Sequence, residues 1–213
     1  MLTRLAAVQP TYDVTEAPAA LLSALGEDPA EPEAAIRVIA ASAPALGAMI
    51  EAMLGVTLAP TKIHASDKVN VIPARAELKV DCRVPPGLGE DVTRARIAEV
   101  LGDYLGALEL AFTETIVGNS SPVHTPLMGA IERLIERVDP GADAVPLILP
   151  GFSDSRWFRD AFPECVAYGF FPQRHQSLLE GSPLVHGANE RIDVRDLGFA
   201  TDCYVALTRE LLS

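Results

Sequence analysis

One residue in this sequence is a candidate for metal chemistry, the histidine His186. It lies beside a glycine in the run HGANERI at residues 186–192. An imidazole nitrogen is a good zinc ligand, but a zinc site needs three or four donors, and none is spaced locally. The sequence contains no HExxH pattern, no HxD pattern and no adjacent pair of glutamates. The residues alone therefore build no metal site, and an ordinary surface histidine is the alternative.

Two further positions suggest the binding of an anion such as a carboxylate. In the run GFSDSRWF at residues 151–158, Gly151 permits close approach of a ligand, and Ser153 can cap a helix whose first N–H groups face an anion. An ordinary strand-to-helix turn is the alternative. Arg83, on the polar face of a predicted strand, can hold a carboxylate through two N–H bonds. Its alternative is an exposed cross-strand pair with an acid.

The elements that position these residues begin with helices. Thr15 caps a helix that runs through Leu25, and Gly26 ends it. Pro32 and Pro44 stand where two further helices begin, because proline is favoured in a first helical turn. This part of the chain is rich in alanine and leucine and contains no cluster of catalytic residue types.

The periodicity then changes to that of strands. Residues 56–63 have strand character, and residues 74–84 alternate strictly between apolar and charged side chains, as a strand with one wet face does. Residues 91–106 return to helical spacing, and residues 107–117 form a third predicted strand. This order predicts an α+β sandwich over residues 1–118, with helices on one side of a sheet that lacks its first strand.

Residues 118–122 (GNSSP) are typical of a joint between domains. Beyond it helices and strands alternate, which predicts an α/β domain over residues 119–213. Two strands are too few for a free-standing layered domain, so we expect this region to be part of a larger one. The predicted elements are a helix capped by Thr125, a strand at 144–149, a short helix from Ser153, a strand at 165–170 and a final helix from about Asp196.

Composition narrows the classes of function. The formal net charge is -12, which disfavours binding to nucleic acid or to anionic lipid. Three cysteines without CxxC spacing argue against a disulfide framework or a zinc knuckle. The most apolar stretch, residues 34–50, contains Arg37 and Pro44 and is too short to span a bilayer. With no signal peptide evident, we expect a cytoplasmic protein.

Three motifs, in this order, resemble those of the zinc-dependent family of acetylornithine deacetylases, succinyl-diaminopimelate desuccinylases and carboxypeptidase S- or G-type peptidases. The first is an NVIP turn at residues 70–73 that leads into a strand ending RVPPG at 83–87. The second is the GFSDSRWF run, in which Phe152 stands where a small polar residue is commoner. The third is HGANERI. Together they cover nearly the whole chain.

The resemblance implies a role for each residue. His186 is expected to bind one of two zinc ions. Asn70 and Arg83 are expected to reach the substrate, often across a dimer, and Gly151 and Ser153 to bind its carboxylate. Glu190 is expected to order the loop of His186. In the complete enzyme the zinc ions activate water for hydrolysis of the amide bond in a peptide or an N-acyl amino acid.

The family's N-terminal half, which carries its HxD pair and its Glu-Glu pair, is not found in this sequence. No catalytic general base is therefore assigned, and we expect the chain alone to be inactive. It would pair with itself or with a complementary N-terminal half. The competing interpretation is a non-catalytic interaction module, and a plain carboxylate-binding protein is a third.

Overall fold

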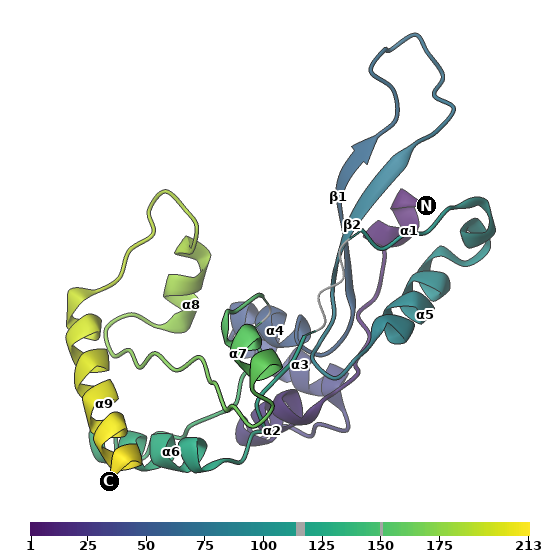
Figure 1. Cartoon of the computed structure of the whole chain (residues 1–213). Helices are drawn as coiled ribbons and strands as arrows, with labels where there is room; N and C mark the ends of the chain where they lie inside the picture. The colour runs from purple at the N-terminus through teal and green to yellow at the C-terminus, as the bar shows by residue number, and fades with distance from the viewer. Residues whose placement is uncertain (114–117, 150) are drawn as a thin grey trace.

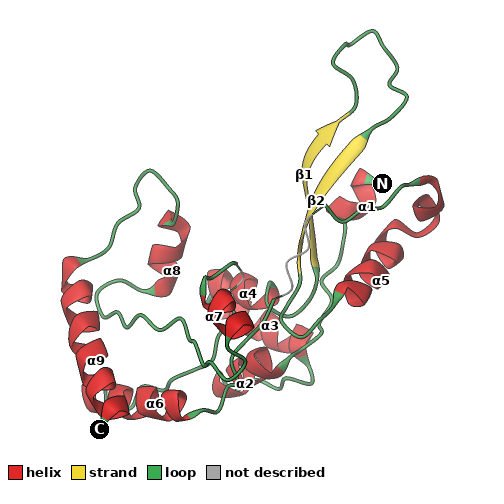
Figure 2. Cartoon of the chain, in the orientation of Figure 1, coloured by secondary structure: helices red, strands yellow, loops and turns green. Residues whose placement is uncertain are grey.

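The computed structural model describes residues 1–113, 118–149 and 151–213, and it combines helices with a two-stranded antiparallel sheet (Figures 1 and 2). The predicted α/β class is confirmed. The elements are α1 Leu2–Ala6, α2 Glu16–Ala24, α3 Pro32–Ser42, α4 Pro44–Glu51, β1 Thr57–His64, β2 Glu77–Arg83, α5 Glu90–Leu101, α6 Pro126–Val138, α7 Ser155–Ala161, α8 Leu178–Gly181 and α9 Val194–Leu212, with 3₁₀ turns at Gly102–Ala107 and Ser182–Leu184.

Helices α2, α3 and α4 pack around the first hydrophobic cluster. Leu22, Ile50 and Leu54 are fully buried in it. Helices α3 and α4 begin at the two prolines that the sequence analysis identified, as the fixed φ of proline favours. Gly47 brings these helices close together, since a Cβ there would lie 2.7 Å from the Cβ of Ala40. The predicted helical region is thus confirmed.

The sheet is a long hairpin that extends away from the three helices (Figure 1). Strands β1 and β2 pair antiparallel, with an irregularity between Pro60 and Lys62. Along β2 exposed and half-buried side chains alternate, which confirms the prediction of one wet face. Its half-buried face packs with residues of α1, β1 and α5 in the second cluster.

The third predicted strand, at residues 107–117, is not found over the residues that the structure describes. Helix α5 runs into the 3₁₀ turn that ends at Ala107, and residues 108–113 form no ladder, while 114–117 lie outside the described residues. Phe112 packs on the second cluster, but Leu108 and Leu110 are exposed. Alternation predicts an extended amphipathic segment, and a strand also needs a neighbour for its N–H and C=O groups.

Helices α6 and α9 form the third cluster, in which Leu134 and Cys203 are almost fully buried. Helix α6 begins as predicted, with the Thr125 hydroxyl accepting a hydrogen bond from the Met128 N–H. The α6–α9 pair also carries an ion pair, in which the guanidinium groups of Arg133 and Arg137 contact one carboxylate, that of Glu210, at 2.7 and 2.9 Å.

The strands predicted at residues 144–149 and 165–170 are wrong for this chain, since neither pairs with another segment among the described residues. Along residues 142–149 half-buried and exposed side chains still alternate, as they do along a strand. Ile148 packs against the first cluster, whereas Val145, Leu147 and Leu149 are 41%, 40% and 58% exposed. The alternation predicted the extended form, but it could not reveal whether a partner strand is present.

Candidate functional site

Asn70 lies in the loop that joins β1 to β2, at the far end of the hairpin, and its side chain is exposed. The loop also presents apolar side chains to solvent, because Val69 and Ile72 are almost entirely exposed. A shallow hollow at its base is lined mainly by polar residues. These include His64 and Asp67, whose imidazole Nε2 and carboxylate Oδ1 are 3.9 Å apart.

Arg83 ends β2, where it pairs with Thr57 in the register of the hairpin. Its Nε lies 3.4 Å from the Asp81 carboxylate, so an exposed acid is its neighbour, although on the same strand rather than across it. Asn70 lies beyond the opposite end of the hairpin, where His64 pairs with Glu77. At about 3.3 Å per residue the two side chains are roughly 20 Å or more apart, so one chain does not bring them together.

The turn with Gly151 and Ser153 leads directly into α7. The Ser153 hydroxyl accepts a hydrogen bond from the Ser155 N–H at 3.3 Å, but the N-cap position of α7 is Asp154, so the prediction that Ser153 caps the helix is wrong by one residue. Both Gly151 and Ser153 are exposed. Phe152 contacts the ring of Trp157 edge-on, with the ring centroids 6.1 Å apart. The turn thus presents its polar atoms and an aromatic pair to solvent.

A polar network fixes α7 against the segment that follows residue 118. The Asn119 amide donates to Asp160 at 2.6 Å and accepts from Arg159 at 2.7 Å. Arg159 also donates to the backbone carbonyl of Ala167 at 2.8 Å. Sequence reasoning missed this network, because its hydrogen-bonded partners are up to 41 residues apart.

His186 is exposed and lies in the loop of residues 177–192, called here the His186 loop. Its φ is 62°, in the left-handed region that few residues other than glycine adopt. The His186 N–H donates to the Glu190 carboxylate at 3.2 Å, so Glu190 does order the backbone at His186. Over the residues that the structure describes, no three His, Cys, Asp or Glu side chains gather into a possible metal site.

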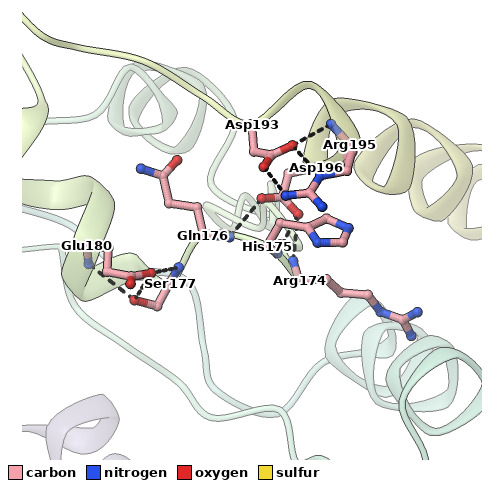
Figure 3. Close-up of polar contacts among 8 residues, drawn as sticks. All are labelled: Arg174, His175, Gln176, Ser177, Glu180, Asp193, Arg195 and Asp196. Carbon is pink, nitrogen blue, oxygen red and sulfur yellow. Dashed lines mark hydrogen bonds and ion pairs between the residues drawn. The ribbon is translucent and has the colours of Figure 1, made fainter.

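Asp196, in the first turn of α9, is the strongest polar anchor of this region (Figure 3). Its fully buried carboxylate accepts hydrogen bonds from the N–H groups of Arg174, His175 and Gln176 at 2.7, 3.0 and 3.0 Å. Burial acts to raise the pKa of Asp196, but the three N–H bonds outweigh it and hold the pKa below its ordinary value. Sequence reasoning used Asp196 only as a helix start.

Three other carboxylates of the same region also have a pKa below its ordinary value. The N–H and hydroxyl of Ser177 lower the pKa of Glu180, bonds from Arg195 lower that of Asp193, and Arg133 with Arg137 lowers that of Glu210. Each group binds its proton less tightly in the folded state than in the unfolded chain, where carboxyl pKa values are about 4. Their stabilisation is complete above that value and is lost as the pH falls through the folded pKa values.

We therefore expect acid to weaken the α6–α9 region first. Between about pH 4 and pH 2, amide hydrogen exchange in residues 174–212 should accelerate before exchange in α2, α3 and α4. Beside the cluster of those three helices burial raises the pKa of Tyr12, and this shift acts at alkaline pH, not in acid. Exchange resolved by segment measures this. Equal acceleration in both regions would show that these four carboxylates do not control the acid response.

None of the helices in the described part of the chain is long and apolar enough to cross a membrane. Residues 19–109, which include α3, α4 and the hairpin, match the family model of the peptidase dimerisation domain. No solved structure matches the chain.

Two curated proteins are similar to this chain. A probable carboxypeptidase S-like protein of Dictyostelium discoideum is 28% identical over 153 residues, which cover 69% of this chain and 30% of the relative. A succinyl-diaminopimelate desuccinylase of Shewanella pealeana is 29% identical over 146 residues, covering 67% of this chain and 34% of the relative. The chain spans about a third of the length of both. The chain is thus similar to the peptidase dimerisation domain over residues 19–109, and over about two thirds of its length to a carboxypeptidase S-like protein and a desuccinylase.

Proposed function

We propose that this chain forms part of a zinc-dependent hydrolase that cleaves the amide bonds of peptides or N-acyl amino acids. The observation that carries the proposal is the match of residues 19–109 to the peptidase dimerisation domain, together with similarity to a carboxypeptidase S-like protein and a desuccinylase. Residues 1–118 are then the lid and dimerisation domain, and 119–213 the end of the catalytic domain. The protein is proposed to be cytoplasmic.

In this proposal His186 supplies one zinc ligand, and Asn70, Arg83, Gly151 and Ser153 bind substrate. The exposed His186 and its fixed backbone suit such a ligand, but among the described residues no three His, Cys, Asp or Glu side chains gather there. One imidazole does not hold a catalytic zinc ion, since such sites use three protein ligands. The chain alone is therefore proposed to be inactive, and the missing ligands and the general base to come from other polypeptide.

Residues 142–149 support a partner for the second region. The segment is extended, one side of it packs on this chain, and the other presents a row of exposed aliphatic side chains. Strands that are apolar on both faces are typical of the interior of a parallel sheet with helices on both sides. A complementary N-terminal half that supplies strands and a second helix layer fits this pattern. The same half would supply the missing ligands.

The second candidate function is a non-catalytic dimerisation module, in which the chain pairs with itself. The hairpin favours it, because over the residues that the structure describes β1 and β2 pair only with each other and each leaves an outer edge without a strand. Such edges readily accept a strand from another chain. Size-exclusion chromatography with light scattering would give twice the monomer mass for a homodimer.

The test of the hydrolase proposal is a metal and activity analysis of the protein purified from its native source with whatever polypeptide accompanies it. We expect bound zinc and hydrolysis of N-succinyl or N-acetyl amino acids, or of dipeptides, that stops when a chelator removes the metal. A native preparation that holds no zinc and hydrolyses none of these amides would contradict the proposal and favour the dimerisation module.

A further inference from the structure

One buried side chain joins the two ends of the His186 loop. The chain enters this loop after Gln176 and leaves it for α9, and the Asp196 carboxylate in α9 bonds the N–H groups of residues 174–176, which are 20–22 residues away in sequence. The same carboxylate is 0% exposed. Figure 3 shows the entering backbone turned toward Asp196. The base of the loop is thus closed by side-chain chemistry rather than by a strand pair.

Within the loop little else ties it to the rest of the chain. No residue from 177 to 192 is buried. Over the described part of the chain, the side-chain hydrogen bonds of this loop stay inside it: Ser177 with Glu180, His186 with Glu190, and Arg191 with the carbonyl of Asn189. Among the described residues no ion pair leaves the loop either. Since its interior is held together by its own bonds, the placement of the whole loop depends on how its base is fixed.

We propose that Asp196 is a positioning residue for His186, because its carboxylate closes the base of the His186 loop and so determines where the imidazole is presented. This rests on the proposed function, in which His186 is a metal ligand. Glu190 fixes the local backbone of His186, and Asp196 fixes the loop as a unit. Asp196 touches neither metal nor substrate in this scheme.

A carboxylate suits this position better than other polar groups. Three successive N–H groups form a concave donor site for an anion, and the first turn of α9 adds the positive end of its helix dipole. Oδ1 accepts from Arg174 and His175, and Oδ2 accepts from Gln176. An asparagine keeps one acceptor oxygen but turns an NH2 group toward the N–H of Gln176. The properties of Asp196→Asn should therefore lie between those of the unaltered protein and those of Asp196→Ala.

Charged groups surround the anchor on both of the segments that meet there. Arg174 and His175 belong to the entering segment, and His175 favours the ionised form of Asp196. Asp193 and Arg195 lie at the start of α9, where they pair with each other at 2.6 Å. Asp193 also accepts from the Arg195 N–H, and among the described residues it makes no hydrogen bond to residues 174–176, although the charge of His175 acts on it. Asp193→Ala is therefore a matched control, which removes an acid and a helix cap at the same end of α9.

The experiment compares Asp196→Ala, Asp196→Asn and Asp193→Ala in the full chain by amide hydrogen exchange and by the NMR signals of ¹³C-labelled histidines. In Asp196→Ala we expect the amides of residues 174–176 to exchange about tenfold faster or more, and the imidazole signal of His186 to shift. Asp196→Asn should give smaller changes in the same direction. The signals of His64 and His124 should stay in place, and Asp193→Ala should leave the His186 signal unchanged.

The proposal is overturned if the His186 signal in Asp196→Ala matches the wild-type signal, or if Asp193→Ala moves it equally. Loss of the fold in both Asp196 variants also overturns it, because the carboxylate would then support the α6–α9 packing itself. The proposed function fails separately. If the native preparation holds no zinc while the His186 signal still depends on Asp196, the hydrolase proposal falls and the closure of the loop by Asp196 stands.

Discussion

Leu54→Ala is expected to lower the free energy of unfolding of the α2–α4 cluster by about 2–5 kcal/mol, the largest stability effect that we predict for this chain. Leu54 is 0% exposed and packs among the buried residues of all three helices. Removing its isobutyl group loses apolar burial and leaves a cavity that the neighbouring backbone fills only in part. Chemical denaturation followed by circular dichroism measures the change.

The three hydrophobic clusters are distinct in the described structure, so the damage should also be local. Hydrogen exchange should accelerate in α2, α3 and α4 and much less in α6 and α9. Val38→Ala is the control, because Val38 lies in α3 but is 57% exposed, and its truncation should change stability by less than about 0.5 kcal/mol. Equal losses from both variants, or equal acceleration in all helices, would contradict this account of the core.

The second large effect concerns catalysis. In the zinc-holding native assembly, His186→Ala should lower the rate of amide hydrolysis by about 10³-fold or more, because several kcal/mol of transition-state stabilisation come from the metal and each 1.4 kcal/mol is tenfold. Zinc content should fall in parallel. The measurement is a steady-state assay beside metal analysis of the same sample.

His124→Ala is the matched control for that assay. His124 is also exposed and also lies beyond residue 118, but it belongs to none of the three motifs. It should leave both rate and zinc content near those of the unaltered protein. A His186 variant that keeps full activity would remove His186 from the metal site, whatever the family of the chain.

Local chemistry explains which elements the sequence could predict. Pro32, Pro44 and Pro126 each occupy the first position of a helix, and these starts depend on nearby residues alone. Helices α1 and α8 were missed because they have only 5 and 4 residues, too few for a hydrophobic period to be recognised. Strands also depend on remote partners. The sequence pattern predicted β1 and β2 correctly, but it also predicted three strands that the described residues do not form.

In the candidate site, too, contacts between nearby residues could be predicted and contacts between remote residues could not. The motifs identified His186 and Glu190, and their hydrogen bond spans four residues, a range that a sequence pattern can express. The anchoring of Asp196 to Arg174 spans 22 residues and uses backbone N–H groups, which every residue but proline carries. No residue type marks such donors in a sequence. The Asn119 network with α7 was found only in the structure for another reason, because its side chains lie 40 and 41 residues apart in the sequence.

We propose that His186 lacks fellow metal ligands within this chain, and amide hydrolysis by the purified chain alone, in the presence of Zn²⁺, tests this proposal most directly. The account predicts no turnover of N-acyl amino acids or dipeptides above that of the His186→Ala variant. Zinc-dependent turnover that disappears in that variant would contradict it, because a working metal site would then be complete within these 213 residues.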